Sequence, residues 1–411
     1  MSLPVAGIRL GVAQASVKKP NKDDITLIEI APGATVSAVF TQNAFRAAPV
    51  HVARKHWLDA GRSARYWLIN TGNANAGTGQ AGMQPALSTC EAVAAASAVS
   101  AAAESVVNSQ QVMPFSTGVI GEPLPHERIN AALPAAFEAL ADNGWERAAN
   151  AILTTDTRPK VASRTVNING NTVTLTGMSK GAGMIRPNMA TMLAFFATDA
   201  AVEQPLLDAL FTTAMNASFN RITVDGDTST NDAAVIAATG ASGVVLSATD
   251  QSPQASDNRA AFTEALESLA IELAQAIVRD GEGATKFVEV VVEGGADNAE
   301  CDAVAYTIAH SPLVKTALFA SDPNWGRLLA AIGRAGLADL VVEDVGVYIN
   351  DVLIAENGAR AASYTEEQGA AAMAPSDLVI RVTLGRGDAC STVWTTDFSY
   401  DYVKINAEYR T

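Results

Sequence analysis

A glycine-rich, proline-containing segment leads directly into a threonine that opens an apolar run. The segment reads KGAGMIRPNMAT over Lys180–Thr191, and the apolar run extends from Met192 to Ala197. A threonine held at the start of a strand can attack the carbonyl carbon of Ala190 if the turn distorts the peptide bond between them. The acyl group would move onto the Thr191 hydroxyl, and water would complete the cut.

Such a cut would leave two reactive groups on Thr191, a hydroxyl and a free α-amine. The reference pKa of an α-amine is about 7.7–8.0, which makes it a better base near neutrality than a lysine at about 10.4. The pattern therefore fits acyl transfer through an N-terminal threonine nucleophile. A simpler interpretation also fits, in which Thr191 is only a β-branched residue in a core strand.

Further motifs follow one another in an order that resembles the ornithine acetyltransferase family of arginine biosynthesis, also called the glutamate N-acetyltransferase or ArgJ-type family. The resemblance covers essentially the whole chain. Its motifs are Asn70–Ala76, Pro114–Gly121, Ile152–Thr157, Lys180–Thr191, Asp225–Asp227, Asp280–Thr285, Asp322–Arg327 and Val403–Thr411. The resemblance implies self-cleavage between Ala190 and Thr191 into chains 1–190 and 191–411, and a heterotetramer with two copies of each.

The resemblance also implies a role for individual residues. Thr117 and Gly118 match the family's oxyanion-stabilising pair. The implied amino-acid pocket consists of Thr154, Lys180, Thr191, Glu282, Asn406 and Thr411. A carboxylate such as that of Glu282 suits a substrate ammonium group, while amide, hydroxyl and lysine groups suit a substrate carboxylate. A cation at Lys180 would also disfavour protonation of a nearby amine.

The implied reaction moves acetyl from N2-acetyl-L-ornithine to L-glutamate through an acetyl-Thr191 intermediate. It needs no metal and no bound cofactor. Some family members also accept acetyl-CoA, which makes acetyl-CoA a candidate co-substrate. The partners expected are therefore small molecules.

Other motifs support competing hypotheses. Gly177–Gly181 fits G-x-S-x-G, which would make Ser179 the nucleophile of an α/β-hydrolase with His310 as its base, but no helix is expected after it. Gly77–Gly82 fits a dinucleotide-binding turn, although we expect no parallel βαβ unit around it. Asp225–Asn231 suggests a calcium loop but lacks the glycine and glutamate required, so we interpret it as a turn that orients the active site. A non-catalytic small-molecule binding protein of the same fold is a further alternative.

Composition narrows the function classes. The 411 residues are 48% hydrophobic, enough for two domains, and carry a net charge of −15, which disfavours nucleic acid and anionic membranes as partners. Cys90, Cys301 and Cys390 are widely spaced, without a CxxC motif, as expected in a reducing cytoplasm. Pro4, Gly7 and Arg9 interrupt any signal-peptide core, so no export signal is expected.

The expected fold class is α/β (α+β), a layered sandwich of mixed or antiparallel sheets flanked by helices, with a smaller C-terminal α/β region. Strands are predicted through most of residues 1–60, with a hairpin around Asn169-Gly170. The last 125 residues are predicted to return to strands, at Phe287–Val292, at Val345–Ile354 around Asn350-Asp351, and at Leu378–Leu384. Helices are predicted over 85–107 (with a buried alanine-rich part), 126–143, 145–153 and 258–279, and one is opened by Pro205. The structural domain boundary is placed between residues 240 and 285.

Overall fold

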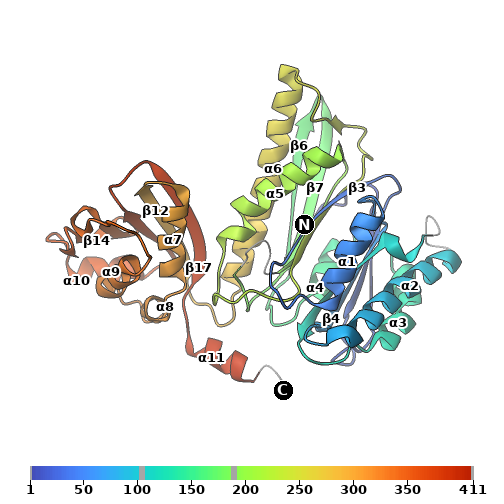
Figure 1. Ribbon diagram of the computed structural model, residues 1–411, viewed down its shortest axis with the longest axis horizontal. Coiled ribbons are helices and arrows are strands. Elements are labelled where there is room, and N and C mark those ends of the chain that lie inside the picture. The colour runs from blue at the N-terminus through green and yellow to red at the C-terminus, as the bar shows by residue number, and fades with distance from the viewer. Residues whose placement is uncertain (1, 101–106, 187–191, 409–411) are drawn as a thin grey trace. The chain divides into compact units, whose positions relative to one another are not determined.

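The computed structural model describes residues 2–100, 107–186 and 192–408 (Figure 1). The described chain forms two compact units. The first unit comprises the described parts of Met1–Gly181, Pro187–Asn220 and Thr228–Ile277, and the second those of Ala182–Arg186, Arg221–Asp227 and Val278–Thr411.

Two sheets build the first unit. One has the order β1-β2-β4-β5 and contains β1 (Ile8–Ala13), β2 (Ile25–Ile30), β4 (Tyr66–Asn73) and β5 (Val112–Val119); its last two strands are parallel and the others antiparallel. The other has the order β3-β10-β8-β7-β6 and contains β3 (Thr35–Phe40), β6 (Lys160–Ile168), β7 (Asn171–Lys180), β8 (Leu193–Thr198) and β10 (Ala233–Ala238). Only β8 and β10 are parallel in it. A small parallel pair joins β9 (Ala201–Val202) to β11 (Val245–Leu246).

The inner faces of these two sheets pack against each other. Phe195 of β8 contacts Trp67 of β4 and Phe115 of β5, with ring centroids 5.9 and 5.1 Å apart respectively. Successive side chains of a strand point to opposite faces of the sheet, so the apolar side chains on the outer face of each sheet must be covered by helices.

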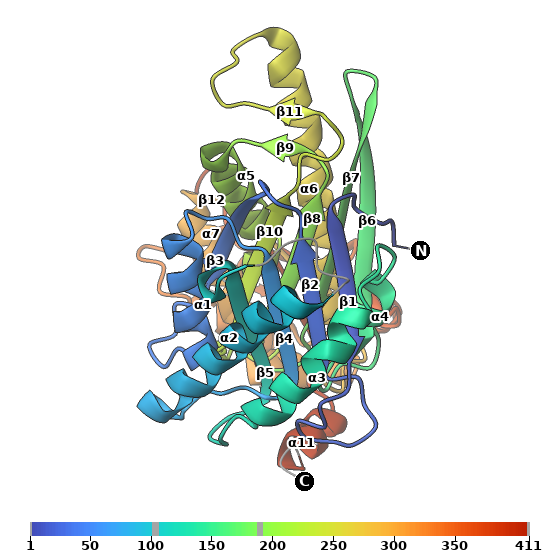
Figure 2. The same cartoon turned by 90° about the vertical axis from the view of Figure 1, so that its right-hand side faces the viewer.

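Helices cover both outer faces of the first unit (Figure 2). The β1-β2-β4-β5 sheet is covered by α1 (Ala48–Asp59), α2 (Met83–Val99) and α3 (His126–Glu138). The other sheet is covered by α5 (Gln204–Ala217) and α6 (Pro253–Arg279), whose Phe211 and Leu273 lie against β8 and β7. The short α4 (Trp145–Ala151) contributes Trp145 to the core between the sheets.

A single six-stranded sheet organises the second unit. Its order is β15-β14-β13-β16-β12-β17, with β12 (Phe287–Gly295), β13 (Gly346–Ile349), β14 (Val352–Glu356), β15 (Ala359–Arg360), β16 (Asp377–Thr383) and β17 (Ala389–Thr396). Only β12 and β16 pair in parallel. Its helices are α7 (Asn298–Ala309), α8 (Pro312–Phe319), α9 (Trp325–Gly333), α10 (Glu366–Met373) and α11 (Tyr400–Ala407). The predicted fold class, mixed α/β with layered sheets, is confirmed.

Several local predictions were wrong. Residues 48–59 form α1, which Pro49 opens and which buries Val52, His56, Ala53 and Trp57 at helical spacing. The three strand segments predicted in the last 125 residues are present as β12, the β13–β14 hairpin and β16, but five helices lie among them that were not predicted. Each of these helices begins with a side-chain cap, at Asp297, Ser311, Asn324, Thr365 and Ser399. The capping residues are visible in the sequence, but strand-forming residues surround them and favour the strand prediction.

The alanine-rich helix also differs from its prediction. α2 ends at Val99, which is exposed, and it buries only one face, formed by Ala86, Thr89, Cys90, Val93 and Ser97. None of the helices in the described part of the chain has both the length and the apolar composition that a membrane span requires.

The expectation that no parallel βαβ unit surrounds Gly77–Gly82 was wrong as well. β4, α2 and β5 form such a unit, since β4 and β5 are parallel. Gly82 nevertheless packs against side chains of its own loop. A Cβ at Gly82 would lie 2.0 Å from Thr78 Oγ1 and 2.6 Å from Asn75 Oδ1, so side chains of the loop itself fill that space.

Candidate active site

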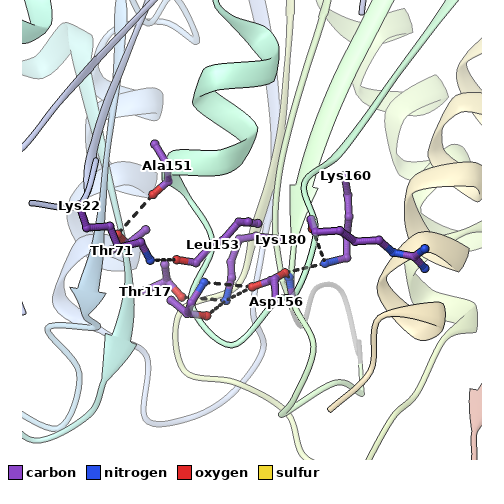
Figure 3. A network of polar contacts seen from close by, with 11 residues as sticks. Lys22, Thr71, Thr117, Ala151, Leu153, Asp156, Lys160 and Lys180 are labelled. Atoms are coloured by element: carbon purple, nitrogen blue, oxygen red, sulfur yellow. Dashed lines mark hydrogen bonds and ion pairs between the residues drawn. The ribbon is translucent and has the colours of Figure 1, made fainter. Parts of the chain in front are cut away.

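Lys180 joins two threonines that are distant in sequence. It is the last residue of β7, and its Nζ donates to Thr154 Oγ1 at 2.7 Å and to Thr117 Oγ1 at 3.2 Å (Figure 3). Thr117 lies in β5, and Thr154 follows α4. Because the ammonium donates to both hydroxyl oxygens, each hydroxyl keeps its own proton available for a further acceptor. Three of the predicted site residues are thus brought together.

A buried carboxylate lies beside this lysine. Asp156 Oδ1 accepts from Lys160 Nζ and from the Gly181 N–H, both at 2.7 Å, and Oδ2 accepts from the Thr154 N–H at 3.1 Å. Lys180 Nζ lies 3.9 Å from Oδ2, and the Asp156 side chain is 0% exposed (Figure 3). Asp156 therefore fixes the backbone on both sides of the Lys180–Thr154 contact.

Charge balance explains how this carboxylate stays ionised. Burial acts to raise the pKa of Asp156, but the cations of Lys180 and Lys160 and its hydrogen bonds outweigh burial and hold the pKa well below its usual range. Asp156 belongs to the Ile152–Thr157 motif, but the sequence analysis gave it no role.

Lys22 is a second site residue that sequence reasoning missed. Its Nζ donates to the Leu153 carbonyl at 2.7 Å, beside Thr154 (Figure 3). Burial lowers the pKa of Lys22, and Lys19 lowers it further. No motif marks Lys22, because its role depends on a loop being folded onto a turn 131 residues away in sequence.

Two asparagines fix the strand that carries Thr117. Ser116 Oγ donates to Asn70 Oδ1 at 2.6 Å, and Asn231 Nδ2 donates to the carbonyl oxygens of Ser116 at 2.9 Å and Ala74 at 2.6 Å. All three polar side chains are buried. The Asn70–Ala76 motif and the segment before β10 therefore hold the backbone just before Thr117.

Gly118 is required by a close approach of two backbones. Its φ is +134°, and a Cβ there would lie 2.3 Å from the carbonyl carbon of Gly72 and 2.6 Å from the Asn73 nitrogen. A side chain at position 118 would therefore push β4 and β5 apart next to Thr117.

The second unit brings Glu282 and Asn406 together. Asn406 Nδ2 of α11 donates to Glu282 Oε2 at 2.8 Å, and the Glu282 N–H donates to the Ala182 carbonyl at 2.8 Å. Glu282 is 7% exposed, and a Cβ at Gly183 would lie 2.4 Å from its Oε2. Glu282 is therefore a buried carboxylate resting on a glycine, and not a solvated surface acid.

The remaining predicted site residues Ala190, Thr191 and Thr411 lie outside the described residues. The Asp225 turn carries no metal-binding geometry, since its carboxylate accepts backbone N–H groups of Met184 and Ile185. Over residues 2–100, 107–186 and 192–408, no three His, Cys, Asp or Glu side chains are grouped so that they could hold a metal ion.

The serine-hydrolase alternative lacks its structural context. Ser179 lies inside β7, its side chain is fully buried, and its Oγ lies 3.5 Å from the Leu273 carbonyl. A nucleophile elbow instead exposes its serine between a strand and a helix. His310 Nε2 lies 3.1 Å from Thr223 Oγ1, and burial, followed by the charges of Arg186 and other cations, lowers its pKa to about 4.

Fold and site together define a class: a layered α/β protein with a buried lysine shared by two threonine hydroxyls and balanced by a buried carboxylate, which suits a small charged molecule. Comparison with known proteins narrows the class, since the sequence profile described as the ArgJ family matches residues 9–411. The chain belongs to the ArgJ family. The family predicted from the sequence motifs is therefore confirmed.

Two relatives extend over nearly the whole chain, and both are named arginine biosynthesis bifunctional protein ArgJ. The protein of Pseudomonas fluorescens (strain Pf0-1) is 54% identical over 408 residues, with 99% of this chain and 97% of that protein covered. The protein of Pseudomonas syringae pv. tomato (strain ATCC BAA-871 / DC3000) is 53% identical over 412 residues, with the same coverage of 99% and 97%.

Similar solved structures include a crystal structure of the ArgJ bifunctional protein from Bacillus halodurans. It is 38% identical, covers 52% of this chain and 97% of its own, and has a TM-score of 0.48. Another is ornithine acetyltransferase complexed with ornithine from Mycobacterium tuberculosis, 32% identical, covering 46% of this chain and 94% of its own, with a TM-score of 0.39.

Proposed function

We propose that this chain transfers acetyl from N2-acetyl-L-ornithine to L-glutamate through an acetyl ester on Thr191. Membership of the ArgJ family makes it an acyltransferase of arginine biosynthesis. The observation that carries the finer proposal is the contact of Lys180 Nζ with Thr117 and Thr154, because three residues expected at the site converge from separate segments.

The first step of the proposed reaction sequence is self-cleavage between Ala190 and Thr191. Thr191 Oγ attacks the Ala190 carbonyl carbon, the C–N bond breaks, and the hydroxyl proton ends on the new amine. Water then hydrolyses the ester and leaves a carboxylate on Ala190. The freed α-amine becomes the base that accepts the Thr191 hydroxyl proton in each later acyl transfer.

Thr117 and Gly118 are proposed to stabilise the oxyanion of each tetrahedral intermediate. The Thr117 hydroxyl accepts from Lys180, so its own O–H is polarised and available to a developing negative oxygen. Removing one such donor typically slows an acyl transfer by about 10²–10³. Asp156 supports this arrangement, because it anchors Gly181 and Thr154 beside the lysine.

Substrate selection is proposed to use Glu282, with Asn406, Thr154, Lys180 and Thr411. Glu282 is a buried carboxylate that receives one hydrogen bond from Asn406, and it retains acceptor capacity for the ammonium of ornithine. Hydroxyl and ammonium groups at Thr154 and Lys180 suit the carboxylate of an amino acid.

A second acetyl donor, acetyl-CoA, is proposed on the basis of the relatives' names. Both relatives that cover 99% of this chain are called bifunctional. Transfer from acetyl-CoA would use the same Thr191 ester and the same acceptor, glutamate. No metal or bound cofactor enters the proposal.

The proposed assembly is a heterotetramer of two 1–190 and two 191–411 chains, and the proposed compartment is the cytoplasm. The free thiols Cys90, Cys301 and Cys390 support a reducing compartment. The oligomer rests on the family resemblance, and the mass of the native protein in solution would test it.

An intact-mass spectrum with N-terminal sequencing tests the central step. Fragments that begin at Met1 or Ser2 and at Thr191 are expected from the wild type, while Thr191→Ala should remain a single chain of 42.6 kDa. Ser179→Ala should still be cleaved. A wild-type chain that stays uncut and inactive would instead favour the non-catalytic binding protein. Initial rates with N2-acetyl-L-ornithine and with acetyl-CoA would then separate one donor from two.

A further inference from the structure

A short segment of the second unit, Ala182–Arg186, is held from two sides. The Ile185 carbonyl accepts from the Val224 N–H at 2.8 Å and from Thr223 Oγ1 at 2.9 Å. At its other end, the Ala182 carbonyl accepts from the Glu282 N–H at 2.8 Å. This segment directly precedes the residues that contain the proposed cleavage site.

The carboxylate of Asp225 holds the middle of the segment. Its Oδ2 accepts from the Met184 N–H at 2.6 Å, and its Oδ1 accepts from the Ile185 N–H at 2.8 Å. Two successive amides bonded to two oxygens of one carboxylate have a fixed orientation, and charge-assisted bonds of this kind are stronger than neutral ones.

Met184 occupies a backbone conformation that its side chain disfavours. Its φ is +56°, in the left-handed region that residues other than glycine rarely adopt, and the residue is 39% exposed. The two bonds to Asp225 lie at Met184 and at the next residue. They oppose relaxation of this conformation at Met184 itself, whereas the bonds to the Ile185 and Ala182 carbonyls hold the two ends of the segment.

We infer that Asp225 is a positioning residue for chain cleavage: it anchors the strained backbone at Met184 and Ile185, upstream of the Ala190–Thr191 bond. The inference rests on the proposed self-cleavage. In that step the bond from Thr191 Oγ to the Ala190 carbonyl carbon forms, the C–N bond breaks, and the hydroxyl proton passes to the amine. Asp225 exchanges no proton. An intramolecular attack of this type depends steeply on geometry, and anchoring Met184 and Ile185 restricts the backbone that leads to the reacting residues.

Pulse-chase translation of the full chain in a cell-free system measures the lifetime of the uncut precursor. Asp225→Asn should lengthen it by about ten-fold or more, because an amide has one acceptor oxygen and cannot bond both N–H groups as before. Asp227→Asn is the matched control in the same turn. Asp227 is exposed, so its replacement should change the lifetime by less than about two-fold.

A second substitution separates positioning from a general loss of structure. Glycine adopts positive φ without cost, so Met184→Gly in the Asp225→Asn background should shorten the precursor lifetime by about three-fold or more. If the double variant is no faster than Asp225→Asn, and both melt at lower temperature than the wild type, the role of Asp225 is structural and the inference is wrong.

The remaining outcomes are also distinguishable. Asp225→Asn cleaving as fast as a cleaving wild type would overturn the inference alone. A wild-type chain that is never cut would overturn the proposed self-cleavage, and the inference with it.

Discussion

At the scale of single residues, the buried carboxylate of Asp156 helps to fix the position of Lys180 in the first unit. Asp156 bonds Lys160, Gly181 and Thr154, and lies within 3.9 Å of the Lys180 ammonium. A buried charge is tolerated only where opposite charges and hydrogen bonds surround it. The arrangement therefore favours the single orientation of the Lys180 side chain in which its ammonium contacts both Thr117 and Thr154.

Asp156→Asn should destabilise the fold and slow acetyl transfer. It removes the negative charge that pairs with Lys160, and breaking a buried ion pair costs about 3–5 kcal/mol in comparable sites. Urea unfolding and kcat/KM measure the two effects. The control is Asp59→Asn, which breaks the exposed Lys55–Asp59 pair at the same i,i+4 spacing and should cost less than about 1 kcal/mol. Equal losses in the two variants would contradict the role given to Asp156.

Lys315 of α8 gives a prediction about pH. It is fully buried, its Nζ donates to Thr395 Oγ1 at 2.9 Å and to the Thr396 carbonyl, and burial lowers its pKa to about 7. Between pH 7 and about 10.4 the unfolded chain holds this proton more tightly than the folded chain does. The free energy of unfolding should therefore rise with pH across that window, by up to about 1.4 kcal/mol per unit.

Lys315→Met removes this titration, so its unfolding free energy should depend less on pH than that of the wild type. Urea unfolding at pH 7 and pH 9.5 provides the comparison. Parallel pH dependences in the two proteins would show that Lys315 does not titrate in this range.

At the scale of elements, β4 and β5 approach each other so closely near their ends that only glycine fits at position 118 of β5. Gly72 and Gly118 are paired in register, and both have positive φ. Thr117 lies next to Gly118 in β5. Lys180 of the neighbouring sheet donates hydrogen bonds to Thr117 and to Thr154, and so links the end of β5 to the turn that carries Thr154. The geometry of the candidate site therefore depends on the close approach of the β4 and β5 backbones as well as on the side chains of these strands.

Gly118→Ala should lower both stability and acetyl transfer, since its Cβ would overlap the backbone of Gly72 and Asn73. A loss of about 1–3 kcal/mol is expected from such overpacking, read from the thermal midpoint and urea unfolding. Gly333→Ala in α9 is the control. No atom lies within 4 Å of its added Cβ, so the variant should be as stable as the wild type or slightly more stable. A neutral Gly118→Ala would mean that β4 and β5 separate easily.

At the scale of the whole molecule, the proposed cut would divide a chain whose two parts share one sheet. β7 precedes the cut and pairs with β8, which follows it, from Leu175↔Thr198 to Lys180↔Leu193. β3 and β10 are likewise on opposite sides of the cut, and they pair over six residues from Ala233↔Phe40 to Ala238↔Thr35. Separating the fragments would expose the shared core between the two sheets.

The two fragments should therefore stay together after cleavage. They should elute as one species in size-exclusion chromatography without denaturant and separate only in urea or detergent, as gel electrophoresis of the same fractions would show. Fragments that separate in native buffer would contradict this shared sheet.

Much of the fold could be read from local sequence. Asn169-Gly170 predicted the β6–β7 hairpin, because only residues tolerant of positive φ fit a two-residue turn, and both have it. The apolar run after Thr191 predicted β8. The helix α1 and the helices after residue 297 were missed, since their caps and 3.6-residue spacing competed with strand-like composition.

The motifs by themselves determined the family and named Thr117, Thr154 and Lys180 as site residues, because residue types at fixed spacing are a local property of the chain. Tertiary structure alone decided that the Lys180 ammonium lies between those two hydroxyls. It also brings the polar side chains of Asp156, Lys22, Asn231 and Asp225 to their hydrogen-bond partners, from which the roles proposed for them were inferred. Those roles depend on burial and on hydrogen bonds between segments far apart in sequence, and neither quantity exists until the sheets have packed.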